Sequence, residues 1–93
     1  MNRIELKLKQ ILQQAIQEAF NIEVALDDLV IENPKIKEHG DYSTNVAMRL
    51  SKQLKNNPRA LASEIVNTIE KNKHPFEKLE IAGAGFINMV VKL

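Results

Sequence analysis

The sequence predicts a small α+β domain: an antiparallel sheet of four strands with about three helices packed on one face. Its 93 residues, 44% hydrophobic and 27% charged, are typical of one globular domain spanning residues 1–93. Apolar residues recur every three or four positions in three long segments and cluster or alternate in short ones. The resulting element order, α-β-β-α-α-β-β, favours helices gathered on one side of an antiparallel sheet.

The first element is an amphipathic helix that ends near Phe20-Asn21. Asn2 is a suitable N-cap, and Glu5, three residues later, completes a pair that resembles a capping box. The predicted buried stripe consists of Ile4, Leu8, Ile11, Leu12, Ala15, Ile16 and Ala19.

Two short strands are expected next. Leu29-Val30-Ile31-Glu32 is rich in β-branched residues, and Asn33-Pro34 closes it. Lys35-Ile36-Lys37 is expected to form a short edge strand. Gly40-Asp41 then breaks the chain.

Two consecutive helices occupy the middle of the chain. The second helix is expected to begin around Ser43-Thr44 and to end at Asn56-Asn57-Pro58, with Ala47, Leu50 and Leu54 on one face. The third follows at once, because Asn57 is a good N-cap and Pro58 suits the first helical position. Its predicted buried stripe is Leu61, Ala62, Ile65, Val66 and Ile69, and Asn72 and His74-Pro75 stop it.

Two strands joined by a glycine turn complete the predicted sheet. Apolar and charged residues alternate over Lys78-Leu79-Glu80-Ile81, and Gly83-Ala84-Gly85 has the backbone freedom that a tight turn needs. In the last strand, Ile87, Met89, Val91 and Leu93 are predicted to face the core, and Phe86, Asn88, Val90 and Lys92 to face away from it.

Phe86 and Asn88 are the sharpest candidate binding residues. They are predicted to share the face opposite the core, beside the glycine turn. An aromatic ring offers a stacking platform, and an amide both donates to and accepts from a base edge, so the pair could read an unpaired nucleotide. The alternative is that Phe86 fills a second small core and Asn88 caps a loop.

The charges are unevenly distributed although thirteen basic and twelve acidic residues give a net charge of only +1. An acidic stretch, residues 21–33, precedes a basic one, residues 34–60. The candidate phosphate contacts in the basic stretch are Arg49, Lys52, Lys55 and Arg59, of which the first three can form one ridge of a helix. A solvated helix face is the alternative interpretation.

Other chemistries lack support in the sequence. There is no cysteine, and two histidines with scattered carboxylates make a zinc site improbable. Gly83-Ala84-Gly85 lacks the third glycine and the following helix of a dinucleotide-binding loop, and Ser43 lacks the setting of a hydrolase nucleophile. We therefore expect no catalytic constellation and no cofactor in this chain. No apolar run is long enough to span a membrane, and a cytoplasmic location is expected.

Three motifs, in this order, resemble the N-terminal domain of bacterial-type arginyl-tRNA synthetases. They are Gly40-Asp41-Tyr42-Ser43-Thr44-Asn45, Asn57-Pro58-Arg59-Ala60-Leu61-Ala62 and Glu80-Ile81-Ala82-Gly83-Ala84-Gly85-Phe86-Ile87-Asn88. The resemblance covers essentially the whole chain, with Ala84 where the family usually has proline. Full synthetases continue into a catalytic domain with a His-Ile-Gly-His type signature and a helical anticodon-binding domain. This chain therefore resembles an excised domain, with a free-standing relative as the alternative.

The resemblance implies a module that grips the D-loop at the outer corner of an arginine tRNA. Phe86 and Asn88 match the positions of the family's base contacts, and Gly83 and Gly85 support the turn beside them. The parent would join arginine to tRNA using ATP with magnesium, and this fragment alone would be inactive. The implied partners are arginine tRNA and the parent's catalytic domain, with no membrane and no DNA.

Two other functions remain open at the level of sequence. A protein-interaction domain would use the exposed face of the last strand for docking. A free-standing binder of single-stranded RNA is suggested by Gly83-Ala84-Gly85-Phe86-Ile87-Asn88-Met89, which resembles a degraded strand of an RNA-recognition motif. However, Ala82 replaces the leading basic residue of that motif, and the helix-first order does not suit that fold.

Overall fold

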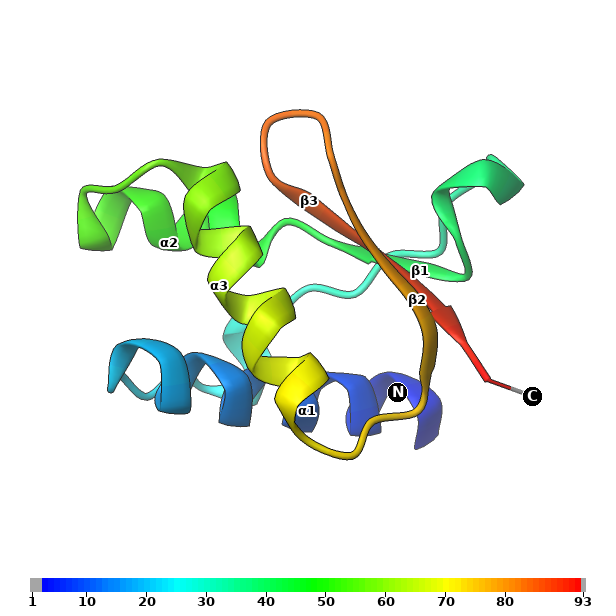
Figure 1. Cartoon of the computed structure of the whole chain (residues 1–93), viewed down its shortest axis with the longest axis horizontal. Coiled ribbons are helices and arrows are strands. Elements are labelled where there is room, and N and C mark those ends of the chain that lie inside the picture. Colours follow the sequence, from blue (N-terminus) through cyan, green and yellow to red (C-terminus); the bar gives the residue numbers. More distant parts are fainter. Residues whose placement is uncertain (1–2, 93) are drawn as a thin grey trace.

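Three α-helices lie on one side of a three-stranded antiparallel sheet in the computed structural model, which describes residues 3–92 (Figure 1). The elements in chain order are α1 (Arg3–Phe20), η1 (Leu26–Asp28), η2 (Lys37–His39), β1 (Tyr42–Thr44), α2 (Val46–Leu54), α3 (Pro58–Lys71), β2 (Phe76–Ala82) and β3 (Phe86–Val91), where η marks a single 3-10 turn. Asn2, the predicted N-cap, and Leu93 lie outside the described residues.

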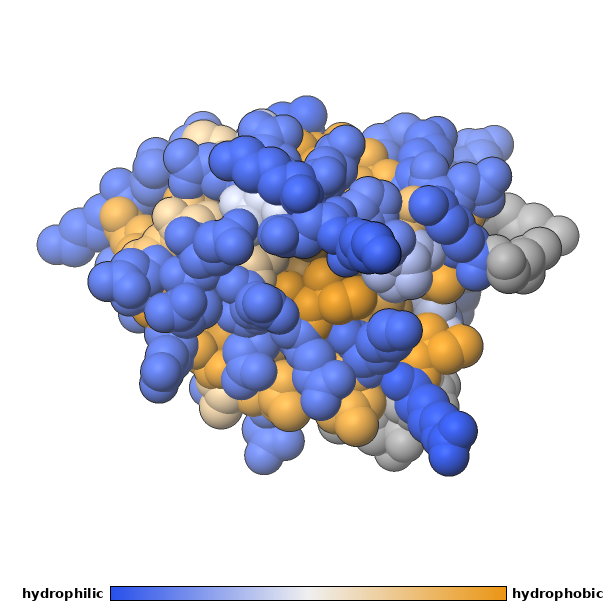
Figure 2. All heavy atoms as spheres, turned by 60° about the horizontal axis from the view of Figure 1, so that its bottom comes forward, coloured by the Kyte–Doolittle hydropathy of each residue, from blue (hydrophilic) through white to orange (hydrophobic). Residues whose placement is uncertain are grey.

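The helices bury their predicted apolar stripes against one another and against one face of the sheet. α1 contributes Leu8, Leu12, Ala15 and Ile16, but Ile4 is 49% exposed at the start of the helix. Ile87 and Met89 of β3 complete this core and are fully buried. Viewed with the α1 side turned forward, the surface is mostly hydrophilic, and the hydrophobic areas between polar side chains are small (Figure 2).

The prediction of four strands is wrong, because neither of the two early strands forms. Within the segment 29–32 only Glu32 pairs, through an isolated bridge in which Glu32 and Ser43 exchange two hydrogen bonds of 2.8 Å. On the side of Ile31 the partner strand ends at Thr44, just before α2 begins at Val46. On the other side Asn33 and Pro34 follow Glu32, and proline has no N–H to donate. The expected edge strand at 35–37 is also absent, and His39 N instead donates to Ile36 O in η2.

A strand that the sequence did not predict, β1, lies where the second helix was expected to start. Tyr42, Ser43 and Thr44 pair with Met89, Asn88 and Ile87, and the helix α2 begins only at Val46. Asp41 anchors this pairing: its N–H donates to Met89 O at 2.8 Å, and its carboxylate accepts from Val91 N at 2.9 Å. Hydrogen bonds to the distant strand β3 therefore prevail over the helix start that the local sequence predicted.

β3 is the central strand, in the order β1-β3-β2. Leu79, Glu80 and Ile81 of β2 lie opposite Met89, Asn88 and Ile87, as an antiparallel hairpin requires. A register shift between Phe76 and Lys78 leaves Glu77 as an extra residue. Because of this bulge, Phe76 is buried in the core, whereas Lys78 and Glu80, at alternate positions of the same strand, are exposed.

Candidate nucleic-acid interface

β3 presents its candidate residues on the face that the helices leave uncovered. Phe86, which is 39% exposed, starts this strand, and Asn88 lies two residues further along. The intervening Ile87 points into the core and is fully buried. Over residues 86–91 this strand has the predicted core face and outer face, whereas Leu93 lies outside the described residues. The exposure of Phe86 disfavours the alternative of a second small core.

Asn88 lies in the middle of the outer face, between Ser43 of β1 and Glu80 of β2. Only 6% of this residue is exposed, yet its side-chain amide forms no hydrogen bond with another described residue. A hollow of about 210 Å³ adjoins it and is lined by Glu38, Gly40, Lys78, Glu80, Asn88 and Val90. The residue is thus largely buried, while the donors and the acceptor of its amide remain available to a ligand at the hollow.

Carboxylates are prominent around this amide. Glu80 lies directly across from Asn88 and pairs with Lys78, whose Nζ is 3.1 Å from its Oε2. Glu32 lies beyond Ser43 on the other side, through the isolated bridge. The carboxylates in this row of residues across the sheet therefore accept hydrogen bonds from the N–H groups of a ligand. The same carboxylates repel phosphate groups.

Phe86 sits one row nearer the β2–β3 turn, opposite Ala82, and does not line the hollow beside Asn88. Its ring packs close to the turn, since a Cβ atom added to Gly83 would lie 3.6 Å from Cδ2 of Phe86. Gly83 and Gly85 both have positive φ, 55° and 138°, which explains the need for glycine in this turn. The structure therefore places Phe86 and Asn88 in adjacent rows rather than in one pocket.

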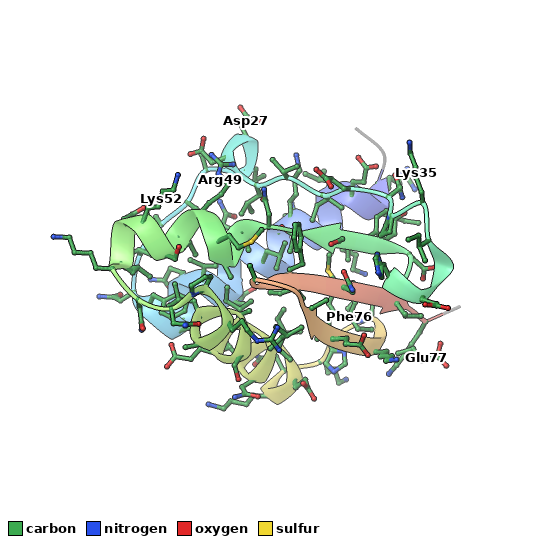
Figure 3. All side chains as sticks on the ribbon, turned by 90° about the horizontal axis from the view of Figure 1, so that it is seen from above. Asp27, Lys35, Arg49, Lys52, Phe76 and Glu77 are labelled. Atoms are coloured by element: carbon green, nitrogen blue, oxygen red, sulfur yellow. The ribbon has the colours of Figure 1, made fainter. Side chains whose placement is uncertain are left out.

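The four candidate basic residues lie in different surroundings. Arg49 Nη1 donates to Asp28 O, so this guanidinium lies against the acidic η1 turn, where Figure 3 shows it near Asp27. Lys52 and Lys55 are exposed at the end of α2 and form no ion pair with another described residue. The four cations therefore differ in how freely their charges can meet a phosphate.

Arg59 has a contact that the sequence did not indicate. Its Nη1 donates a hydrogen bond to the carbonyl oxygen of Gly83, 24 residues further along the chain. The second and third motifs of the sequence thus meet in space at the turn that leads into Phe86. The signal in the sequence was the co-occurrence of these motifs, but it did not reveal which atoms would touch.

The described residues contain no cluster of three or more His, Asp or Glu side chains that could hold a metal ion. Among the same residues, no helix has both the length and the apolar character needed to cross a bilayer. The outer face of the sheet carries the candidate base-reading residues Phe86 and Asn88, and its chemistry is that of aromatic stacking and hydrogen bonding.

Comparison with known proteins gives a consistent result. A family model described as "Arginyl tRNA synthetase N terminal domain" matches residues 6–91. The arginine–tRNA ligase of Bacillus licheniformis is 46% identical over 93 residues, covering 95% of this chain and 16% of the ligase. That of Bacillus subtilis is 45% identical over 87 residues, covering 88% of this chain and 16% of the ligase.

Two solved structures share the fold. Arginyl-tRNA synthetase from Plasmodium falciparum superposes with a TM-score of 0.81 at 25% identity, covering 99% of this chain and 16% of that one. The synthetase from Thermus thermophilus gives a TM-score of 0.76 at 21% identity, with 96% of this chain and 14% of that one covered. The present chain therefore corresponds to a small part of the length of these relatives.

Proposed function

Because this chain belongs to the arginyl-tRNA synthetase N-terminal domain family, we propose that it binds the D-loop at the outer corner of an arginine tRNA. The observation that carries the proposal is the outer face of β3, where an exposed aromatic ring lies two residues from an amide without an intramolecular partner among the described residues. The longer protein is proposed to be an arginine–tRNA ligase, since the relatives that match this chain are arginine–tRNA ligases.

In the proposed complex, Phe86 stacks on an unpaired base of the D-loop, a contact worth about 1–3 kcal/mol per base. Asn88 hydrogen-bonds the edge of a base from its position one row further along the face. Since the Asn88 side chain has already lost most of its water, such a bond carries little further desolvation cost for the protein.

Phosphate contacts are proposed to come from the end of α2 and the start of α3. Lys52 and Lys55 are exposed there, and Arg59 stands close to the turn before Phe86. Arg49 is a weaker candidate, because its guanidinium bonds to the acidic η1 turn. These contacts would orient the RNA without selecting its sequence.

ATP, magnesium and arginine are assigned to the catalytic domain of the longer protein. The contribution proposed for this chain is therefore recognition of tRNA.

The proposal is tested by titrating the isotopically labelled chain with an arginine tRNA transcript at low and moderate salt, with a non-cognate tRNA as control. NMR shift changes should centre on Phe86 and Asn88, favour the arginine tRNA and weaken as salt rises. Phe86→Ala and Asn88→Ala should each weaken binding about tenfold or more. Ile4→Ala removes an exposed apolar side chain of α1, away from this face, and should have no effect. Spectra that stay unchanged in a large excess of tRNA would overturn the proposal.

A second candidate function is docking on the catalytic domain through the same face. The exposed ring of Phe86 and the near-zero net charge favour it. Salt separates the two functions, because contacts with several phosphates weaken steeply with ionic strength and an apolar contact between proteins changes little. A shift pattern on β3 that appears with the catalytic domain and is insensitive to salt would support docking.

A further inference from the structure

The start of α3 and the β2–β3 turn form one structural unit. Gly85 packs so closely on Pro58 that a Cβ atom at Gly85 would lie 3.0 Å from Pro58 Cβ and 3.2 Å from the Pro58 carbonyl oxygen. Arg59 then reaches across to the carbonyl of Gly83. The turn is closed by Gly85 N, which donates to Ala82 O at 3.2 Å. The direction in which Phe86 leaves the turn therefore depends on the first residues of α3.

At the start of α3, the backbone N–H donors are already hydrogen-bonded, whereas the Arg59 side chain has donors that a ligand could use. The Asn57 side chain accepts hydrogen bonds from the backbone N–H groups of Arg59 and Ala60, so these groups are already satisfied. The Arg59 guanidinium carries five N–H donors, and the single side-chain bond recorded among the described residues uses one of them. Its positive charge is exposed and has no carboxylate partner among those residues.

From this geometry we propose that Arg59 is a positioning residue for Phe86 that also binds RNA. One N–H of Arg59 holds the Gly83 carbonyl and fixes the turn, and the remaining N–H groups bind the phosphate of the nucleotide whose base stacks on Phe86. This inference rests on the proposed binding of tRNA and adds a specific role to one of the four candidate cations. Arg59 thereby couples the backbone of the bound nucleotide to the platform for its base.

Arginine suits this double role better than lysine does. The guanidinium is a rigid planar fork, so it can donate to a carbonyl on one edge and to a phosphate on another. A lysine ammonium supplies the same charge from a single nitrogen and cannot hold both partners in a fixed plane. The substitution Arg59→Lys therefore separates the geometric contribution of Arg59 from its charge.

The experiment compares Arg59→Lys with Lys52→Ala, which removes a charge from the adjacent end of α2 without touching the turn. In the free protein, the Gly85 amide should exchange its hydrogen about tenfold faster in Arg59→Lys than in the wild type and at the wild-type rate in Lys52→Ala. With arginine tRNA, Arg59→Lys should bind about tenfold more weakly with an unchanged salt slope. Lys52→Ala should lower the salt slope by about one.

Each outcome decides a part of the inference. Wild-type exchange at Gly85 in Arg59→Lys would refute the positioning role, whether or not the chain binds tRNA. Faster exchange with undiminished tRNA affinity would refute the coupling between the turn and RNA binding. If neither the wild type nor any variant binds tRNA, the proposed function fails. The exchange measurement still decides whether Arg59 positions the turn.

Discussion

Gly40 occupies a backbone position that no residue with a side chain can take without distortion. Its φ is +86°, and a Cβ atom there would lie 2.8 Å from the carbonyl oxygen of Met89. We expect Gly40→Ala to lower the free energy of unfolding by about 3 kcal/mol, because both backbone strain and a backbone clash oppose it. Urea denaturation measures this loss.

The matched control for this prediction is Gly83→Ala. Gly83 also has positive φ, +55°, but the nearest atom to an added Cβ is 3.6 Å away. Only the left-handed conformation then opposes the substitution, at a cost of about 1–2 kcal/mol. Equal losses for the two variants would show that the close approach to Met89 contributes nothing.

Asn88 is a residue at which recognition and stability should conflict. Only 6% of the residue is exposed and its amide has no hydrogen-bond partner among the described residues, so this polar group is incompletely hydrated, which disfavours the folded state. Asn88→Leu, of similar shape, should raise the free energy of unfolding by about 1 kcal/mol and abolish the selective response to arginine tRNA. Chemical denaturation and the NMR titration measure the two effects. A less stable Asn88→Leu protein would indicate a structural role for the amide.

Single residues differ in how well the sequence predicts their surroundings. The outward positions of Phe86 and Asn88 follow from strand alternation, which is a local property. The bonds from Arg59 to Gly83 and from Arg49 to Asp28 join distant parts of the chain. No spacing rule contains such bonds, so the sequence did not indicate that the guanidinium groups of Arg49 and Arg59 hold backbone carbonyls elsewhere in the chain.

At the scale of one helix, the N-cap of α3 is expected to affect both the helix and the β2–β3 turn that packs on its start. Asn57 accepts from Arg59 N at 2.8 Å and from Ala60 N at 3.2 Å. Asn57→Ala should cost about 1 kcal/mol of stability through loss of the cap. It should also speed hydrogen exchange at Gly85, because the turn rests on this helix start. Thermal denaturation and NMR measure the two effects.

Asn67→Ala provides the control, since Asn67 is exposed in the interior of the same helix. Alanine has the higher helix propensity, and the substitution should stabilise the protein by about 0.5 kcal/mol while leaving Gly85 unaffected. A destabilised Asn67→Ala protein, or one with faster exchange at Gly85, would mean that the turn responds to helix content in general.

At the scale of elements, helices were easier to predict than strands. Periodicity and capping residues located three helices, because both signals lie within each helix. The segment 29–32 has the composition of a strand but pairs only through Glu32, whereas Tyr42-Ser43-Thr44 lacks a strand pattern and pairs fully. Whether a segment becomes a strand here depends on whether β3 is available to pair with it. Asp41 holds its segment against β3 through the bond from Val91 N, and such a contact is a property of the whole fold.

The molecule has one core that all three helices share with the sheet. Leu12→Ala in α1 should therefore lower the free energy of unfolding by about 3 kcal/mol, and helix content and protection of β3 amides should be lost in the same transition. Circular dichroism monitors the helix content, and hydrogen exchange monitors the protection of the β3 amides. Ile4→Ala, at an exposed position of the same helix, should change stability by less than about 0.5 kcal/mol. Strands that remain protected after the helices melt would contradict a single cooperative unit.

The sheet order leaves β2 at one edge, and no described strand pairs with its outer side. Such an edge is a ready template for intermolecular strand addition and hence for aggregation. The extra residue at Glu77 interrupts that template, and the charges of Glu77, Lys78 and Glu80 are exposed along it. A second copy of the chain therefore meets a kinked, charged border, which disfavours edge-to-edge association.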